Sequence, residues 1–162
     1  MTLDVLSWAV LAAYVVHLLD ETLINGGFVS WVSTNFWPSY TMRMFFWFNA
    51  VAVVLIGAGN IAFDLFGGHL VVLPLFWITG FTLHGLTVHV FWTIRQRSYS
   101  PGLVTAVLYW IVMYFFARYG YVAGLISGTD FWAGVVSGAL VLGGFLTVGP
   151  TVLFPALNRS RS

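Results

Sequence analysis

The sequence of 162 residues contains no cysteine and no lysine, and only 7% of its residues are charged. Without cysteine there can be neither a disulfide framework nor a cysteine-ligated metal site. Six arginines and five acidic residues leave a formal net charge of +1, which excludes a basic nucleic-acid-binding domain, so we expect no nucleic-acid partner. Soluble domains carry about 25% charged residues, and this chain has too few to cover a water-facing surface.

Apolar residues are abundant instead: 60% of the chain is hydrophobic, 19% is aromatic and the mean hydropathy is +0.93. This composition predicts an all-α polytopic membrane helical bundle, with residues 1–162 forming a single transmembrane domain. A helix needs about 20 mostly apolar residues to cross the hydrocarbon layer. Five segments satisfy this requirement, at residues 5–24, 43–65, 70–93, 103–127 and 131–154.

The distribution of charge predicts on which side of the membrane each end of the chain lies. The first four residues lack a positive charge and ionisable residues interrupt the first apolar run, so we expect a span there and not a secretory signal. Five of the six arginines fall on one side of the predicted bundle, and Asp4, Asp64 and Asp130 fall on the other. The positive-inside rule then predicts an N-terminus outside and a C-terminus in the cytoplasm. We expect the membrane to be the plasma membrane of a prokaryote.

Two further segments have a recognisable composition. Residues 25–41 are too polar to cross and contain Trp31 and Trp37, which favours an interfacial stretch with its indoles at headgroup depth. Glycines recur every four residues late in the chain, a spacing that lets helix backbones approach closely in lipid. We expect these glycines to pack helices within the chain, with a homo-oligomer as the alternative; they are Gly120, Gly124, Gly128, Gly134 and Gly138.

Polar side chains interrupt the first three predicted spans. His17, Asp20 and Glu21 stand at helical positions i, i+3 and i+4, so all three leave one face of the first helix. An ionisable residue at the bilayer centre costs roughly 2.5–3.5 kcal/mol on insertion scales, so such a group requires partners or water. Asn49 in the second span and a histidine pair in the third fall at a similar depth in the cytoplasmic half, which predicts one shared intramembrane site.

A metal centre is the first chemistry that this site allows. Histidine and carboxylate ligands suit zinc or iron, and His17 with Glu21 can hold one ion from a single helix face. His84 and His89 are the further candidate ligands, and Asp20 is a candidate ligand or general base. On an ideal α-helix residues five apart point about 140° away from each other, so we expect only one of the two histidines to reach the ion unless the helix is distorted.

Acid/base chemistry without a cofactor is the alternative. Two adjacent carboxyls in a low dielectric repel each other's charge, so Asp20 or Glu21 should keep a proton and could donate it, with His17 beside them. Asn49 completes the predicted catalytic set. Such a site could protonate an alkene or epoxide of an isoprenoid, and aromatic walls formed by Tyr14, Trp47 and Trp92 could stabilise the resulting cation. Arg95, just below the site, either binds a headgroup or anchors the topology.

The leading hypothesis is therefore a metal-dependent membrane enzyme that takes a lipid-like or isoprenoid substrate sideways from the membrane. A cofactor-free isomerase or cyclase is the runner-up. A proton-coupled transporter, a structural membrane subunit and a polar cluster that only joins helices are the non-enzymatic alternatives.

The order of these residues resembles the HXXEE family of small membrane proteins. His17-x-x-Asp20-Glu21 is similar to the motif that names the family, with aspartate in place of its first glutamate. A downstream asparagine, a histidine pair and a Tyr-x-Pro-Gly loop at residues 99–102 also match its pattern, and the likeness covers most of the first 110 residues. The family has no assigned function, so the resemblance implies a site at these positions and no particular reaction.

Overall fold

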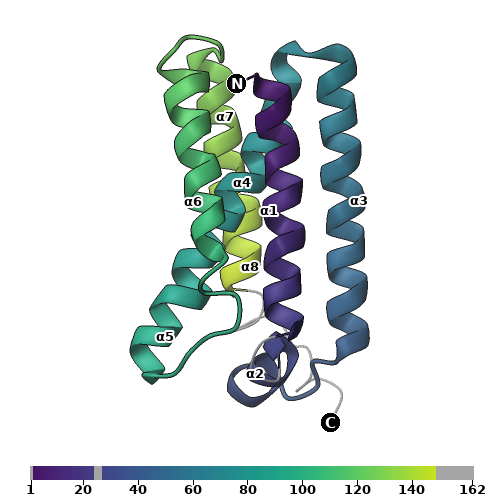
Figure 1. Ribbon diagram of the computed structural model, residues 1–162, viewed down its shortest axis with the longest axis vertical. Helices are drawn as coiled ribbons and strands as arrows, with labels where there is room; N and C mark the ends of the chain where they lie inside the picture. Colours follow the sequence, from purple (N-terminus) through teal and green to yellow (C-terminus); the bar gives the residue numbers. More distant parts are fainter. Residues whose placement is uncertain (1, 24–26, 149–162) are drawn as a thin grey trace.

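The computed structural model describes residues 2–23 and 27–148, and this part of the chain consists of helices and turns (Figure 1). Long helices run up and down the bundle, and the short helices α2 and α5 lie at one end of it. The α-helices are α1 (Leu3–Leu23), α2 (Gly27–Asn35), α3 (Met42–Phe66), α4 (Val72–His84), α5 (Phe91–Gln96), α6 (Ala106–Phe115), α7 (Gly128–Ser137) and α8 (Gly144–Val148). A 3₁₀ turn, η1 (Gly68–Val71), precedes α4, and three π-helical segments, η2 (Gly85–Val90), η3 (Phe116–Tyr121) and η4 (Gly138–Gly143), continue α4, α6 and α7.

The all-α membrane bundle predicted from composition is confirmed. Four continuous helices are long and apolar enough to cross a membrane. The first of them, α1, has 21 residues and so is about 31 Å long at about 1.5 Å per residue, close to the roughly 30 Å of a hydrocarbon core. The four helices are Leu3–Leu23, Met42–Phe66, Gly68–Gln96 and Gly128–Leu146.

The predicted span at 103–127 was too long. Its helix runs only from Ala106 to Tyr121, as α6 and η3. The chain before it forms a turn, and after it the amides of Leu125 and Ile126 both donate to the carbonyl of Gly120, which ends the helix. The last predicted span extended to residue 154, and its final residues lie outside the described part of the chain.

The helix α4 lies at the centre of the bundle, where it packs against α1, α3, α6 and α7. Half of the most apolar window of the Gly68–Gln96 helix is buried, against 17% of the corresponding window in α3. Leu75 and Ile78 of α4 are fully buried in the main core together with Leu6 and Val10 of α1. Most of α3 therefore faces outwards, and α4 carries the inner face of the site described below.

Close packing of α7 on α4 depends on glycine. A Cβ atom on Gly138 would lie 2.3 Å from the backbone oxygen of Phe76, and one on Gly134 would lie 2.5 Å from Cβ of Leu75. Neither position has room for a larger residue. The expectation that the spaced glycines pack helices within the chain is confirmed for these two.

The segment between the first two spans forms a cover at one end of the bundle. Phe28 and Val32 of α2 are buried with Trp37, Phe45 and Val88 in a second apolar cluster. Trp37 is only 6% exposed, so its indole packs inside the protein. The depth of this segment in the membrane stays a prediction.

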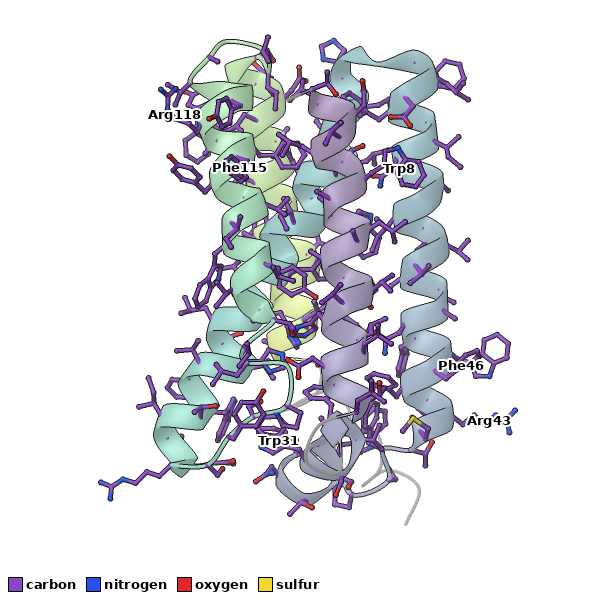
Figure 2. The ribbon with its side chains drawn as sticks, in the orientation of Figure 1. Trp8, Trp31, Arg43, Phe46, Phe115 and Arg118 are labelled. Atoms are coloured by element: carbon purple, nitrogen blue, oxygen red, sulfur yellow. The ribbon has the colours of Figure 1, made fainter. Side chains whose placement is uncertain are left out.

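Asp64 and Asp130 lie at the end of the bundle opposite Arg43, and Arg118 lies at the same end as these two acids. At one end Asp64 accepts a hydrogen bond from the indole of Trp8, and Asp130 pairs with His69 at 2.7 Å. Arg43 lies at the opposite end, near α2 (Figure 2). This separation is the one on which the predicted orientation depends, and the orientation itself stays a prediction.

Candidate metal centre

Four side chains from α1 and from the continuous helix formed by α4 and η2 converge near the end of the bundle where α2 lies. His17 and Glu21 come from α1, His84 ends α4, and His89 lies in η2. Each offers one ligand atom, and these atoms all lie within 4.8 Å of one another. Nε2 of His17 is 3.3 Å from Oε1 of Glu21, and Nε2 of His89 is 3.6 Å from the same oxygen. The group is enclosed, since His17, Glu21 and His89 are buried and His84 is half-buried.

A π-helical turn brings the two histidines of the third span together. On an α-helix, residues five apart would diverge, but η2 begins directly after His84 and contains His89. The wider i→i+5 turn of a π-helix places residues five apart on nearly the same face, and such turns are frequent at functional sites. The two imidazole ring centroids are 4.9 Å apart. The distortion that the sequence analysis required is therefore present, and both histidines reach the site.

The inward-facing nitrogens have no hydrogen-bond partner among the described residues. They are Nε2 of His17, Nδ1 of His84 and Nε2 of His89, and all three are buried. Leaving a buried polar atom unsatisfied costs about 1–3 kcal/mol, so three such atoms facing one carboxylate need a common partner. Three imidazole nitrogens and one carboxylate oxygen form a donor set that suits zinc or iron. The residues therefore fit a divalent metal ion.

The outer nitrogen of His17 is held by a short relay. Its Nδ1 lies 3.0 Å from Oγ1 of Thr105, and this hydroxyl donates to Oδ2 of Asp20 at 2.7 Å. Because the hydroxyl proton is directed to the carboxylate, its oxygen accepts the Nδ1–H of His17, which leaves Nε2 with a lone pair facing inwards. Carboxylates that orient metal-binding histidines in this way are common around metal sites. Asp20 is thus outside the group of four ligand atoms and acts on it through Thr105.

The loop between α5 and α6 closes over the centre. Oγ of Ser100 lies 3.0 Å from Nδ1 of His89, so each of these two histidines has an outer partner near this loop. Gly102 has a φ of +92°, and a Cβ atom there would lie 2.7 Å from Cε1 of His17 and 2.8 Å from Cε1 of His89. Only glycine satisfies both the backbone angle and the close approach. The Pro-Gly turn noted in the sequence is therefore part of the wall of the site.

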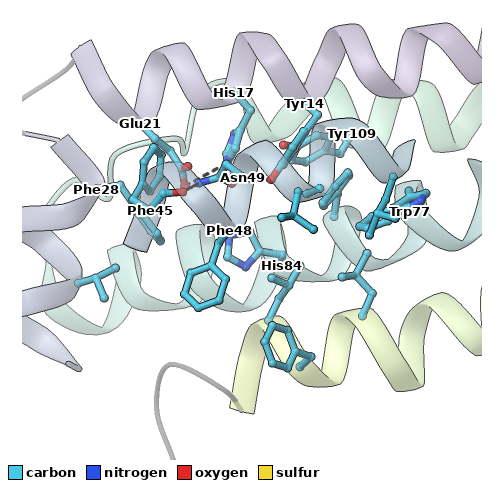
Figure 3. Close-up of a pocket in the computed structure, with 18 of the residues that line it drawn as sticks. Tyr14, His17, Glu21, Phe28, Phe45, Phe48, Asn49, Trp77, His84 and Tyr109 are labelled. Atoms are coloured by element: carbon cyan, nitrogen blue, oxygen red, sulfur yellow. Dashed lines mark hydrogen bonds and ion pairs between the residues drawn. The ribbon is translucent and has the colours of Figure 1, made fainter. Parts of the chain in front are cut away.

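A cavity of about 250 Å³ opens from the centre (Figure 3). His17, Glu21 and His84 form its polar end, and most of the remaining wall is aromatic or aliphatic. The wall includes Phe28 and Trp37 from the cover, Phe45, Phe48, Val51 and Leu55 from α3, Trp77 and Phe81 from α4, Leu142 from η4, and Phe145 and Leu146 from α8.

The other predicted site residues divide into two groups. Tyr14 and Asn49 both line the cavity, where the hydroxyl of Tyr14 donates to Oδ1 of Asn49. Trp47, Trp92 and Arg95 do not line it. Trp47 is 59% exposed on the outer face of α3, and Arg95 lies over the ring of Trp92 at 5.7 Å from its centroid. The structure does not bring these three side chains to the site.

Two site residues on α6 and the preceding turn, Thr105 and Tyr109, were missed from the sequence. Tyr109 is fully buried, lines the cavity and has its ring centroid 4.9 Å from that of His17. The signal for both was their spacing, since residues at i and i+4 share one helix face. That face follows directly on the Tyr-x-Pro-Gly loop at residues 99–102.

The comparisons with known proteins identify a family whose function is unknown. The family described as "protein of unknown function with HXXEE motif" matches residues 8–117, which is more than half of the chain. No curated protein and no solved structure matches the chain. The matched region contains all four candidate ligands as well as Thr105 and Tyr109. The protein therefore belongs to the HXXEE family, and its own motif reads His17-Leu18-Leu19-Asp20-Glu21.

Proposed function

We propose that this protein is a membrane metalloenzyme that binds zinc or iron through His17, Glu21, His84 and His89 and acts on a lipid-like substrate. The observation that carries the proposal is the convergence of three buried imidazole nitrogens, none of them hydrogen-bonded, on one carboxylate at the polar end of an apolar cavity. A structural role in joining helices would be served by hydrogen bonds, whereas two of these nitrogens only approach Oε1 of Glu21, at 3.3 and 3.6 Å.

The relation between the ligands and the cavity favours a catalytic centre over a structural one. Structural zinc sites are closed by four protein ligands, whereas catalytic sites keep one position open for water or substrate. Here His17, Glu21 and His84 form part of the cavity wall, so an ion held by these three would keep a further position open to the cavity, whereas all four ligands would close a tetrahedral zinc site. A bound ion would supply Lewis-acid activation of a substrate oxygen or of water. The protein's own contribution is to orient the ligands, to exclude bulk water and to hold the substrate against an aromatic wall.

The position of the cavity mouth supports a substrate that enters from the membrane. On α3, Phe48, Val51 and Leu55 line the cavity and are also about half exposed on the outside of the bundle. On the opposite side of the opening, Phe145 of α8 lines the cavity and is 47% exposed. We therefore place the mouth on the side of the bundle, between these two sets of apolar residues. A hydrocarbon chain can reach the centre by this route without passing through water.

A cofactor-free isomerase or cyclase remains the second candidate, and one observation favours it. Oε1 of Glu21 lies within 3.6 Å of two imidazole nitrogens and on the wall of the aromatic cavity, where Tyr14 and Phe81 stack at 4.5 Å. A protonated Glu21 could deliver its proton to an alkene or epoxide there, and the ring faces would stabilise the cation. Asp20 does not line the cavity, so Glu21 is the donor in this alternative.

Elemental analysis distinguishes the two candidates. The protein is purified in lipid nanodiscs, and metal content and thermal melting with and without chelator are measured for the wild type, Glu21→Gln and Asp64→Asn. As a ligand Glu21 must be ionised, so Glu21→Gln should empty the site, whereas Asp64→Asn removes a carboxylate at the other end of the bundle and should leave metal content unchanged. If the wild type holds no zinc or iron and chelator leaves the melt unchanged, the metalloenzyme proposal fails and the acid/base reading takes its place.

A further inference from the structure

The hydroxyl of Tyr109 is a buried group that the metal centre does not use. Tyr109 is 0% exposed, its hydroxyl has no hydrogen-bond partner among the described residues, and its side chain lines the cavity. Figure 3 shows it beside Tyr14, next to His17 at the polar end. Burying a hydroxyl without a partner is unfavourable, so this group needs an acceptor that enters the cavity.

The neighbouring polar groups already have hydrogen-bond partners. Tyr14 donates to Oδ1 of Asn49, and Nδ2 of Asn49 donates one of its two protons to the backbone oxygen of Phe45 at 2.7 Å. Tyr109 is the member of this trio whose polar group has no hydrogen bond among the described residues. Its position next to His17, with ring centroids 4.9 Å apart, places that proton close to the ligand group.

Apart from the histidines and a metal ion that they would hold, the cavity wall carries no cation that could receive an acidic headgroup. None of the residues that line it is arginine, the sequence contains no lysine, and the four arginines in the described part of the chain are exposed outside it. Burial, with a smaller contribution from Glu21, raises the pKa of Tyr40 above its usual value, so this phenol on the wall also stays neutral. In metal-free protein a phosphate or carboxylate would enter without an arginine or lysine to compensate its charge, at a large desolvation cost.

We propose that the cavity binds an uncharged lipid that carries a carbonyl or ether oxygen, and that this oxygen accepts a hydrogen bond from Tyr109 beside the metal position. The inference deepens the proposed function by naming the substrate class, and its metal-adjacent part rests on that function. The apolar remainder of the lipid lies along Trp77, Phe81 and Leu55 towards the mouth. In metal-free protein we expect free fatty acids and lipid phosphates to bind poorly, because the wall offers their charge no arginine or lysine.

The test uses three brominated probes of equal chain length in nanodiscs: a long-chain methyl ketone, the corresponding alkane and the corresponding alkyl phosphate. Bromine quenches tryptophan fluorescence, and Trp77 on the wall is the reporter, so Trp77→Phe should remove the specific signal. The ketone should bind about threefold to tenfold more tightly than the alkane, the range of one net hydrogen bond. Tyr109→Phe should abolish this preference, and Tyr114→Phe, which changes an exposed tyrosine of the same helix, should preserve it.

Each outcome has a distinct meaning. A ketone preference that survives in Tyr109→Phe, or an alkyl phosphate that binds metal-free protein as tightly as the ketone does, would overturn the proposal. The comparison of ketone and alkane in the wild type needs no variant, so it decides the case even if Tyr109→Phe fails to fold. All titrations are run both after metal removal and after reloading with zinc or iron. A preference present in metal-free protein that binds no metal on reloading would refute the proposed metalloenzyme and leave the Tyr109 subsite standing.

Discussion

Replacement of Gly102 by alanine should impair metal binding much more than folding. A Cβ atom there would lie 2.7 Å from a ring carbon of His17 and 2.8 Å from a ring carbon of His89. Non-bonded carbon atoms rest at about 3.5 Å or more, so the loop and the two rings must separate by about 0.7 Å. Metal sites tolerate ligand displacements of only about 0.2 Å, and the substitution therefore moves two ligands out of range at once.

Gly124 provides a matched control for the backbone effect. It also has a positive φ, of +77°, and a Cβ atom there would meet nothing within 4 Å. Each alanine should cost about 1–2 kcal/mol, because an L-residue is forced into the left-handed region. Only Gly102→Ala should lose metal affinity, by about 10- to 100-fold, which is the usual effect of disturbing the surroundings of metal ligands.

Chelator competition in nanodiscs measures the affinity of each variant for zinc and iron, and thermal melts in excess chelator compare their folds without metal. We expect similar melts for the two variants and a large difference in affinity. If Gly102→Ala binds metal as tightly as Gly124→Ala does, the close packing of the loop does not position the ligands, and the argument from the glycine is refuted.

Two further predictions concern the relay and the orientation. Thr105→Ala removes the hydroxyl between Asp20 and His17, so metal affinity should fall about 10- to 100-fold. Thr105→Ser keeps a hydroxyl at this position and should retain most of the affinity. Equal losses in both variants, measured by the same chelator competition, would show that the hydroxyl does not support metal binding. For the orientation, the absence of native cysteine allows single-cysteine labelling. An impermeant maleimide applied to intact cells should modify Thr129→Cys and spare Ser98→Cys, and the reverse pattern would invert the predicted topology.

Composition and helical spacing were sufficient for the bundle and for the ligands on the first helix. His17 and Glu21 lie one turn apart, so any continuous helix places them on one face. The need for a distortion between His84 and His89 also followed from the 100° step of an α-helix. The distortion is a π-helical turn that starts directly after His84. Its form depends on how α4 and η2 pack against the neighbouring helices, and residue spacing alone does not determine that packing.

The surroundings of the ligands were harder to predict because they depend on contacts between distant segments. Thr105 reaches His17 and Asp20 across more than eighty residues of sequence. Trp47 and Trp92 looked suitable as aromatic walls, yet the rotation of α3 and the outward course of α5 carry them away from the cavity. Tertiary packing sets the direction in which a side chain of a helix points. Apolar spans with little hydrophobic periodicity do not encode this direction in their sequence.

A cavity mouth on the side of the bundle determines which ligand concentration controls occupancy of the cavity. Phe48 and Leu55 of α3 and Phe145 of α8 line the cavity and are about half exposed, so for the lipid ligand that we propose the relevant solvent is the bilayer. Occupancy then follows the mole fraction of the lipid in the membrane, and a weak intrinsic affinity suffices for a lipid that the membrane already concentrates. Detergent molecules share the same apolar chains, so they act as competitors for the cavity. Dilution into micelles would therefore hide binding that a native-like bilayer reveals.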